Sequence, residues 1–216
     1  MGVNIFRFKS ISVFFKFFLL ACVFFPICAL SVCLLLASSG AWGPLPDFKE
    51  LENPETNLAT EILSDENKVL GKYFYENRTH VEYENLSKDL INALIATEDE
   101  RFFNHTGIDF IALIRVLKGV ITGNRNLGGG STITQQLAKM FFSKKPSSKI
   151  DRVKQKFKEW IIAVRIERQY SKQEIIAMYL NRFDFLNLAV GIKSASKIYF
   201  NTTPDNLTIE ESATLI

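Results

Sequence analysis

The feature that most constrains this chain is an apolar run near its N-terminus, Phe17–Ala37, that contains no charged residue. As an α-helix rising about 1.5 Å per residue, the run would be about 31 Å long, which matches the hydrocarbon core of a bilayer. Arg7, Lys9 and Lys16 precede it, and no acidic residue does. Because basic residues stay on the cytoplasmic side, we expect residues 1–16 in the cytoplasm, a single transmembrane helix at 17–37, and the rest outside the cytoplasmic membrane.

The alternative is a signal peptide cleaved near Ala37–Ser39, although the apolar run is long for the hydrophobic part of a signal peptide. All three cysteines lie inside this run. The part expected outside the membrane therefore offers no disulfide framework, no cysteine metal site and no cysteine nucleophile. A formal net charge of +3 is too small to indicate a nucleic-acid partner.

The remaining sequence predicts a linker followed by one mainly α-helical domain. Residues 38–57 carry Gly, Pro and few periodic apolar positions, as linkers do, and residues 58–216 form the domain. Two β-prone runs, Leu58–Leu63 and Val69–Tyr75, predict a small hairpin at its start. Apolar periodicity and cap signals then predict helices that begin after Ser87, span Ile108–Ile121, Thr132–Phe142 and Lys149–Gln169, run from Ser171 to Asn181, and begin again at Glu210. The last helix has no stop signal, so we expect the natural protein to continue beyond Ile216.

Glu98 ends an apolar helix face, because it follows Leu94 by four residues and Leu90 by eight. Partial burial and the negative end of the helix dipole both disfavour a charged carboxylate, and this suits a general base. Taken alone, a solvated acid at a helix end is the more common interpretation. A lone histidine in the following loop, His105, is more often a hydrogen-bonding structural residue than a catalyst, and we expect that role here.

A glycine-rich loop, Gly128–Gly130, leads into a polar helix start. Its backbone N–H groups are unobstructed, a hydroxyl from Ser131–Thr132 can cap the helix, and a helix N-terminus binds anions. The amides of Gln135–Gln136 suit sugar hydroxyls, and Lys139 adds a positive charge one turn later. The alternative is a plain flexible hinge before an N-capped helix.

Basic residues dominate the segment Lys144–Lys158, where Asp151 is the only acid. On a helix, cations and one acid would form a row beside an apolar stripe. Such a row suits a diphosphate with an adjacent sugar, and its alternative is a solvated face that touches anionic lipid headgroups. The row is Lys149, Arg152, Lys156 and Glu159, and the expected core stripe is Ile150, Val153, Phe157, Trp160, Ile161 and Val164.

Together these segments resemble the family-51 glycosyltransferases, which form the transglycosylase domain of class A penicillin-binding proteins and of monofunctional peptidoglycan polymerases. The similarity extends from about Leu58 to Ile216 and consists of five motifs in family order. They are ATEDERFFNHTGID at 96–109, GGSTITQQLAK at 129–139, KFKE at 156–159, IIAMYLN at 175–181 and AVGIKSASKIYF at 189–200. Gln155 replaces a common Arg, Met140 replaces a frequent Asn, and a glycine usual between 181 and 191 is absent.

The resemblance implies a lysozyme-like fold that polymerises lipid II with inversion at the anomeric carbon and releases undecaprenyl diphosphate. It implies that Glu98 removes the proton of the acceptor hydroxyl, and that Glu159 positions the donor or a diphosphate-bound cation. Lys139, Lys156 and Arg152 would neutralise the diphosphate. The other substrate-binding residues that it implies are Asp99, Phe102, His105, Gly130, Ser131, Thr132, Thr134, Gln135, Gln136, Tyr179 and Asn181.

The sequence leaves several points undecided. One is whether a divalent cation, Mg²⁺ or Mn²⁺, binds at the diphosphate. The expected partners are lipid II, the growing lipid-linked glycan and the membrane, while a transpeptidase domain after Ile216 and other cell-wall synthesis proteins are undecided. A lysozyme-like enzyme that cleaves peptidoglycan is less favoured, because a glycan leaving group needs no row of cations. An inactive membrane-anchored scaffold rests only on the departures at Gln155 and Met140.

Overall fold

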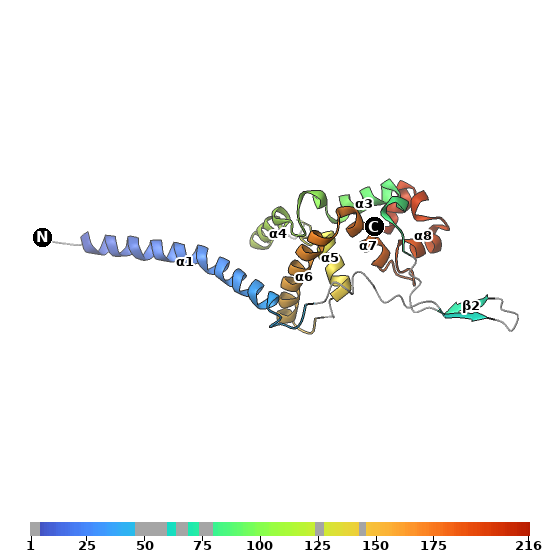
Figure 1. Cartoon of the computed structure of the whole chain (residues 1–216). Coiled ribbons are helices and arrows are strands. Elements are labelled where there is room, and N and C mark those ends of the chain that lie inside the picture. The colour runs from blue at the N-terminus through green and yellow to red at the C-terminus, as the bar shows by residue number, and fades with distance from the viewer. Residues whose placement is uncertain (1–4, 46–59, 64–68, 74–79, 124–127, 143–145) are drawn as a thin grey trace. The chain divides into compact units, whose positions relative to one another are not determined.

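A computed structural model describes all residues except 1–4, 46–59, 64–68, 74–79, 124–127 and 143–145 (Figure 1). The chain divides into two compact units. The first combines Met1–Leu45 with Ser147–Lys158, and the second combines Pro46–Pro146 with Glu159–Ile216. Helices make up most of the described residues, so the expected mainly α-helical class is confirmed.

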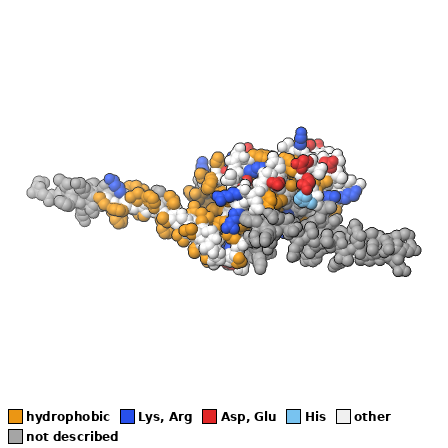
Figure 2. Space-filling model, in the orientation of Figure 1, with side chains coloured by type: hydrophobic (Ala, Val, Ile, Leu, Met, Phe, Trp, Pro, Cys, Tyr) orange, Lys and Arg blue, Asp and Glu red, His pale blue; other side chains and the backbone are white. Residues whose placement is uncertain are grey.

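The first unit begins with a long helix, α1 (Ile5–Ser38). Its stretch Val13–Ser38 has a mean hydropathy of 2.8, and it is the one helix among the described residues that is long and apolar enough to cross a membrane. Apolar side chains predominate on the part of this helix that is coloured in the space-filling view (Figure 2). The predicted span at 17–37 lies inside it, and Pro26 is accommodated within the helix.

After α1 the chain turns, and Trp42 contacts the first half of α6 (Lys149–Gln169). The rings of Trp42 and Phe157 lie 6.0 Å apart, centroid to centroid. At its N-terminus, α6 is fixed by the hydroxyls of Ser147 and Ser148, which donate to Asp151 at 2.6 and 2.7 Å. The first half of α6 is thereby tied to the segment that leaves the apolar helix.

The second unit starts with the predicted hairpin, in which β1 (Thr60–Leu63) and β2 (Val69–Tyr73) pair antiparallel. Thr60 lies opposite Tyr73, and the register is irregular between Ile62 and Leu63. The expected turn at 64–68, the outer ends of both predicted runs and most of the predicted linker lie outside the described residues.

Helices then follow in the expected order, and the side-chain caps explain where they begin. The Leu90 amide donates to the Ser87 hydroxyl at the start of α3 (Lys88–Glu98), and Ser171 with Glu174 forms the predicted capping box of α7 (Lys172–Arg182). α5 (Ile133–Phe142) packs with α7, and α3 packs with α9 (Ile209–Leu215). The elements are η1 (Tyr83–Asn85), α3 (Lys88–Glu98), η2 (Phe102–Asn104), α4 (Phe110–Thr122), α5 (Ile133–Phe142), α7 (Lys172–Arg182), α8 (Ile192–Phe200), η3 (Pro204–Asn206) and α9 (Ile209–Leu215).

The apolar stripe predicted along α6 is wrong. Ile150 and Val153 are exposed, and Phe157, Trp160, Ile161 and Val164 are only half-buried. The buried face consists of Glu159, Ile162, Ala163 and Ile166. The backbones of Gly107 and Ala163 pack closely, because a Cβ on Gly107 would lie 2.9 Å from the Ala163 carbonyl carbon. This close approach turns the face that carries Ala163 toward the core, rather than the face with the aromatic residues.

Candidate active site

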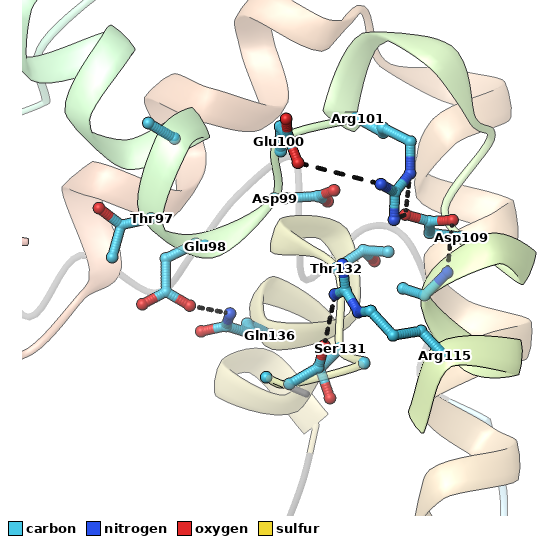
Figure 3. A pocket seen from close by; sticks show the side chains of 15 residues that line it. Thr97, Glu98, Asp99, Glu100, Arg101, Asp109, Arg115, Ser131, Thr132 and Gln136 are labelled. Atoms are coloured by element: carbon cyan, nitrogen blue, oxygen red, sulfur yellow. Dashed lines mark hydrogen bonds and ion pairs between the residues drawn. The ribbon is translucent and has the colours of Figure 1, made fainter. Parts of the chain in front are cut away.

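A cavity of about 460 Å³ opens where α3 ends and α5 begins, beside the first turns of α4 (Figure 3). Residues of the glycine loop (128–130) and of the motif at 96–109 line it, although these segments are separated in the sequence. Its walls are mainly polar. The lining residues are Ala96, Thr97, Glu98, Asp99, Glu100, Arg101, Asp109, Ala112, Arg115, Gly128, Gly129, Gly130, Ser131, Thr132 and Gln136.

Glu98 is the last residue of α3 and is half-buried. Leu90 and Leu94 on the same helix face are fully buried, so the predicted apolar face that ends in a carboxylate is confirmed. The Gln136 amide donates to Glu98 Oε2 over 2.6 Å, and the Tyr179 hydroxyl lies 3.2 Å from the amide oxygen Oε1 (Figure 3 shows the first contact). Glu98 Oε1 accepts no hydrogen bond from the described residues.

Tyr179 supports this arrangement from α7, where its side chain is almost completely buried. Burial raises the pKa of Tyr179 well above its ordinary value, and the negative charge of Glu98 raises it further. The hydroxyl therefore stays protonated at every physiological pH. It can donate to Gln136 and cannot become a second negative charge behind Glu98.

Asp99, the C-cap of α3, joins this helix end to the start of α5. The Ile133 amide donates to Asp99 Oδ2 over 3.1 Å, and His105 Nε2 lies 3.1 Å from both carboxylate oxygens. The Gly107 amide donates to His105 Nδ1, so in the neutral ring Nε2 carries the proton and donates to Asp99. These contacts agree with the structural role expected for His105.

Gly107 is the second connection between this loop and α5. Its φ of +90° and its contact with the Ala163 backbone leave no room for a side chain. Its carbonyl accepts from the Thr132 hydroxyl at 2.8 Å and from the Gln135 amide at 3.0 Å. Thr132 also accepts from the Gln135 backbone N–H, so Thr132, not Ser131, caps α5, while Ser131 is exposed at the cavity.

Two arginines line the cavity and were missed by the sequence analysis. Arg101 Nε donates to Asp109 Oδ2 at 2.9 Å, and Arg101 Nη2 lies 2.7 Å from the same oxygen. Arg115 donates to the carbonyl of Gly129 in the glycine loop at 3.2 Å (Figure 3). The available signal was position: Arg101 follows Glu98 by three residues, and Arg115 lies on the helix that Asp109 caps.

Asp109 is buried, and burial alone would raise its pKa. The hydrogen bond from the Ala112 amide and the contact with Arg101 outweigh burial and hold the pKa of Asp109 below its ordinary value. The same ion pair raises the pKa of Arg101, against the effect of burial. Arg101 is thus fixed as a cation at the cavity wall.

Other residues expected to bind substrate have their side chains engaged inside the domain. Phe102 is fully buried, and the buried Thr134 donates to Glu167 over 2.5 Å. Asn181 pairs with the backbone N–H and carbonyl of Val81 at 2.9 and 2.8 Å. Gln135 is also buried. Substrate contact by these four residues stays a prediction, and their geometry explains how the site is held together.

The second acid and the basic row do not line the cavity. Glu159 is buried on α6 and is absent from the cavity wall. Arg152 is exposed and Lys156 half-buried, both in the half of α6 that belongs to the first unit, and Lys139 is exposed on α5. The roles predicted for these four residues remain predictions.

A buried ion pair that the sequence did not reveal lies behind the loop. Lys172 Nζ is 2.8 Å from Glu167 and donates to the carbonyl of His105 over 2.7 Å. It also lies 4.2 Å from the centre of the Phe102 ring. Through Thr134, Glu167 connects this pair to α5, so the pair fixes the α3–α4 loop against the helix that carries Gln136.

These contacts define what the cavity can do chemically. One oxygen of a half-buried carboxylate is held by an amide, and the other can accept a proton from a hydroxyl placed in the cavity. Arg115 and the glycine loop are suited to an anion nearby, while the charge of Arg101 is offset by Asp109. Among the described residues, no three His, Cys, Asp or Glu side chains form a cluster that could hold a metal ion.

Comparison with known proteins identifies the class to which this fold and site belong. The family model described as Transglycosylase matches residues 66–216, which is most of the chain. The chain therefore belongs to the transglycosylase family, in agreement with the lysozyme-like fold expected from the sequence.

Similar curated proteins include three named Penicillin-binding protein 1A. The protein from Escherichia coli (strain K12) is 32% identical over 209 residues, which cover 94% of this chain and 23% of that protein. The protein from Rickettsia typhi is 37% identical over 172 residues (78% and 21%), and that from Aquifex aeolicus is 34% identical over 189 residues (88% and 26%). The chain spans about a quarter of the length of these relatives.

Proposed function

We propose that this chain is a peptidoglycan glycosyltransferase that polymerises lipid II into glycan strands at the outer face of the cytoplasmic membrane. The observation that carries the proposal is the half-buried Glu98 carboxylate at a polar cavity, with Oε2 held by Gln136. Family membership and the names of the relatives support the same activity.

In the proposed reaction, Glu98 accepts the proton of the acceptor GlcNAc 4-hydroxyl as the new bond forms. The hydroxyl oxygen attacks the anomeric carbon of the donor MurNAc from the face opposite the diphosphate, so that carbon is inverted. The bond between the anomeric carbon and the diphosphate oxygen breaks, and its electron pair leaves with undecaprenyl diphosphate. Glu98 thereby ends the step protonated, and charge is conserved.

The departing diphosphate needs positive charge nearby. Arg115 lies at the cavity wall, where Arg101 is already paired with Asp109, and we propose that Lys139, Arg152 and Lys156 supply further positive charge. The described residues do not by themselves form a complete ligand set for Mg²⁺ or Mn²⁺. If a divalent cation takes part, Glu159 would help to position it, and the cation would add positive charge beside the leaving diphosphate.

Two apolar surfaces support work at a membrane. α1 has the length and composition of a membrane span, and the positive charges before it favour a cytoplasmic N-terminus. α4 exposes large apolar side chains, which water covers poorly and acyl chains would cover well. They are Phe110, Ile111, Ile114, Leu117, Val120 and Ile121.

The test is incubation of the detergent-solubilised chain with labelled lipid II and, separately, with finished peptidoglycan. The proposal predicts lengthening glycan products from lipid II and no shortening of the finished polymer. Cleavage of the polymer without growth from lipid II would replace the transferase with a lysozyme-like hydrolase. Repeating the lipid II reaction with a chelator decides whether a divalent cation is needed.

A further inference from the structure

The start of α6 exposes a row of apolar side chains. Ile150 is 68% exposed and Val153 is 55% exposed, and the two lie about one turn apart on the same helix face. Phe157, one turn further along that face, is half-buried. Single exposed apolar residues are ordinary on a protein surface, whereas a row of them marks a surface that contacts a partner. The apolar pattern at the start of α6 therefore needs an explanation other than the protein core.

This row leads to the turn that follows the apolar helix α1. The Trp42 ring lies 6.0 Å from the Phe157 ring, and the Ala41 amide donates to the Leu36 carbonyl in the last turns of α1 at 3.2 Å. Tryptophan is enriched at the boundary between membrane and water. If α1 spans the bilayer, Trp42 lies where the chain leaves it, and the apolar row of α6 reaches the same level.

Positive charges lie along one edge of the row. Lys149 and Arg152 each precede an apolar residue of the row by one position, and both are exposed. The only acid between residues 147 and 158 is Asp151, whose carboxylate accepts hydrogen bonds from the Ser147 and Ser148 hydroxyls at the start of the helix. An exposed apolar row with basic residues beside it is the pattern of a helix that lies in an anionic membrane surface.

We propose that the first half of α6 is a membrane-surface contact, in which Ile150 and Val153 enter the lipid–water interface and Lys149 binds anionic phospholipid headgroups. Two observations favour a bilayer over a protein as the occupant: the row meets the turn that follows α1, and the charges at its edge are basic. The inference rests on the membrane span proposed for α1 and does not depend on glycosyl transfer. It agrees with the diphosphate role proposed for Arg152, because a lipid-linked diphosphate lies at the level of the headgroups.

The experiment places a fluorescent label at Val153 in the full chain and measures quenching by lipids that carry a nitroxide just below the headgroup. Cys22, Cys28 and Cys33 are first replaced by alanine, so that Val153→Cys is the only labelled site. Ile209→Cys is the matched control, because Ile209 is an apolar residue of similar exposure, 61%, at the start of α9. In vesicles that mix phosphatidylcholine with phosphatidylglycerol, quenching at 153 should be at least about twice that at 209.

The role of the anionic headgroups is tested by removing one charge. In the mixed vesicles, Lys149→Gln should lower the equilibrium constant for membrane contact, as measured by quenching at 153, about fivefold, because one basic residue near an anionic surface contributes about that factor. In phosphatidylcholine alone, the same variant should have little effect. Lys197→Gln is the control, because Lys197 is also exposed but lies on α8, and it should leave the quenching unchanged.

Hydroxyl-radical footprinting of the unaltered chain provides an independent check if the labelled variants fold poorly. In the mixed vesicles, Ile150 and Val153 should be oxidised less than Ile209. Protection of both residues without quenching by the lipid nitroxides would mean that a protein, such as a second copy of the chain, covers the row, and would overturn the proposal. Equal quenching at 153 and 209, or equal quenching with and without phosphatidylglycerol, would overturn it as well.

Flotation and lipid II polymerisation separate this inference from the proposed function. A chain that floats with the vesicles while its label at 153 is unquenched keeps the span of α1 and loses the surface contact. A chain that does not float loses both. Quenching at 153 without polymer formation would leave the membrane contact in place and refute the proposed glycosyltransferase activity.

Discussion

Replacing Lys172 by methionine should destabilise the domain strongly, because the charge that it leaves behind is buried. The Glu167 side chain is 3% exposed and that of Lys172 is 19% exposed, and their charged atoms are 2.8 Å apart. Methionine keeps most of the apolar length of lysine and removes the amine. Glu167 would then keep only the hydrogen bond from Thr134, and the His105 carbonyl would lose its donor.

Removing one partner of a buried ion pair costs about 3–5 kcal/mol in free energy of unfolding. Because the lysine is partly exposed, we expect about 3 kcal/mol for Lys172→Met, a large part of the roughly 5–15 kcal/mol that stabilises a typical domain. The double variant Lys172→Met/Glu167→Gln removes the stranded charge and keeps an acceptor for Thr134. It should recover about half or more of the loss.

The assay is urea unfolding of the full chain in detergent, followed by circular dichroism, with the change taken from the midpoint at constant slope. Lys197→Met is the control, since this exposed lysine only reaches Asn201, and it should change stability by less than about 0.5 kcal/mol. If Lys172→Met is no more damaging than Lys197→Met, or if the double variant is the least stable, the pair does not hold the loop as described.

Two further outcomes follow from the same loop. Gly107→Ala should lower the free energy of unfolding by at least about 2 kcal/mol in the same urea assay, because its Cβ would lie 2.9 Å from the Ala163 backbone at a φ of +90°. An equal or higher urea midpoint would contradict this packing. Asp109 has a folded pKa below its ordinary 3.8, so its stabilising contribution is present above that value and is lost as the pH falls through the folded pKa. Urea midpoints from pH 6 to pH 2 should therefore fall more steeply for the wild type than for Asp109→Asn, and parallel curves would refute this.

The sequence was sufficient to predict the elements whose signals are local. Ser87 and Ser171 were predicted to cap helices, and both do so in the structure. The ends predicted for the long helix, Lys149–Gln169, agree with those of α6. The position of Glu98 at the end of a buried face followed from spacing alone, because Leu94 is one turn and Leu90 two turns before it. Helix α8 was not predicted as a helix, although its residues fall in the fifth motif.

Long-range contacts could not be predicted in this way. The buried face of α6 is selected by the backbone of Gly107, which lies in another part of the chain, and a helical pattern read along α6 alone chose the wrong face. Glu167 and Asp99 each also have a partner from the distant start of α5, Thr134 and the Ile133 amide, so a buried acid and a surface acid look the same in the sequence. The motifs identified residues that meet in one region, but not which of them face the cavity.

The most direct test of the central claim compares lipid II polymerisation by the wild type, Glu98→Gln and Glu100→Gln, each shown to be folded. Both acids line the cavity, but Glu100 is exposed and Glu98 is held by Gln136. Loss of a general base commonly lowers the rate by about 10²- to 10⁴-fold, so Glu98→Gln should lose at least about 100-fold while Glu100→Gln stays within about threefold. Polymerisation by Glu98→Gln at the wild-type rate would contradict the assignment of Glu98 as the base.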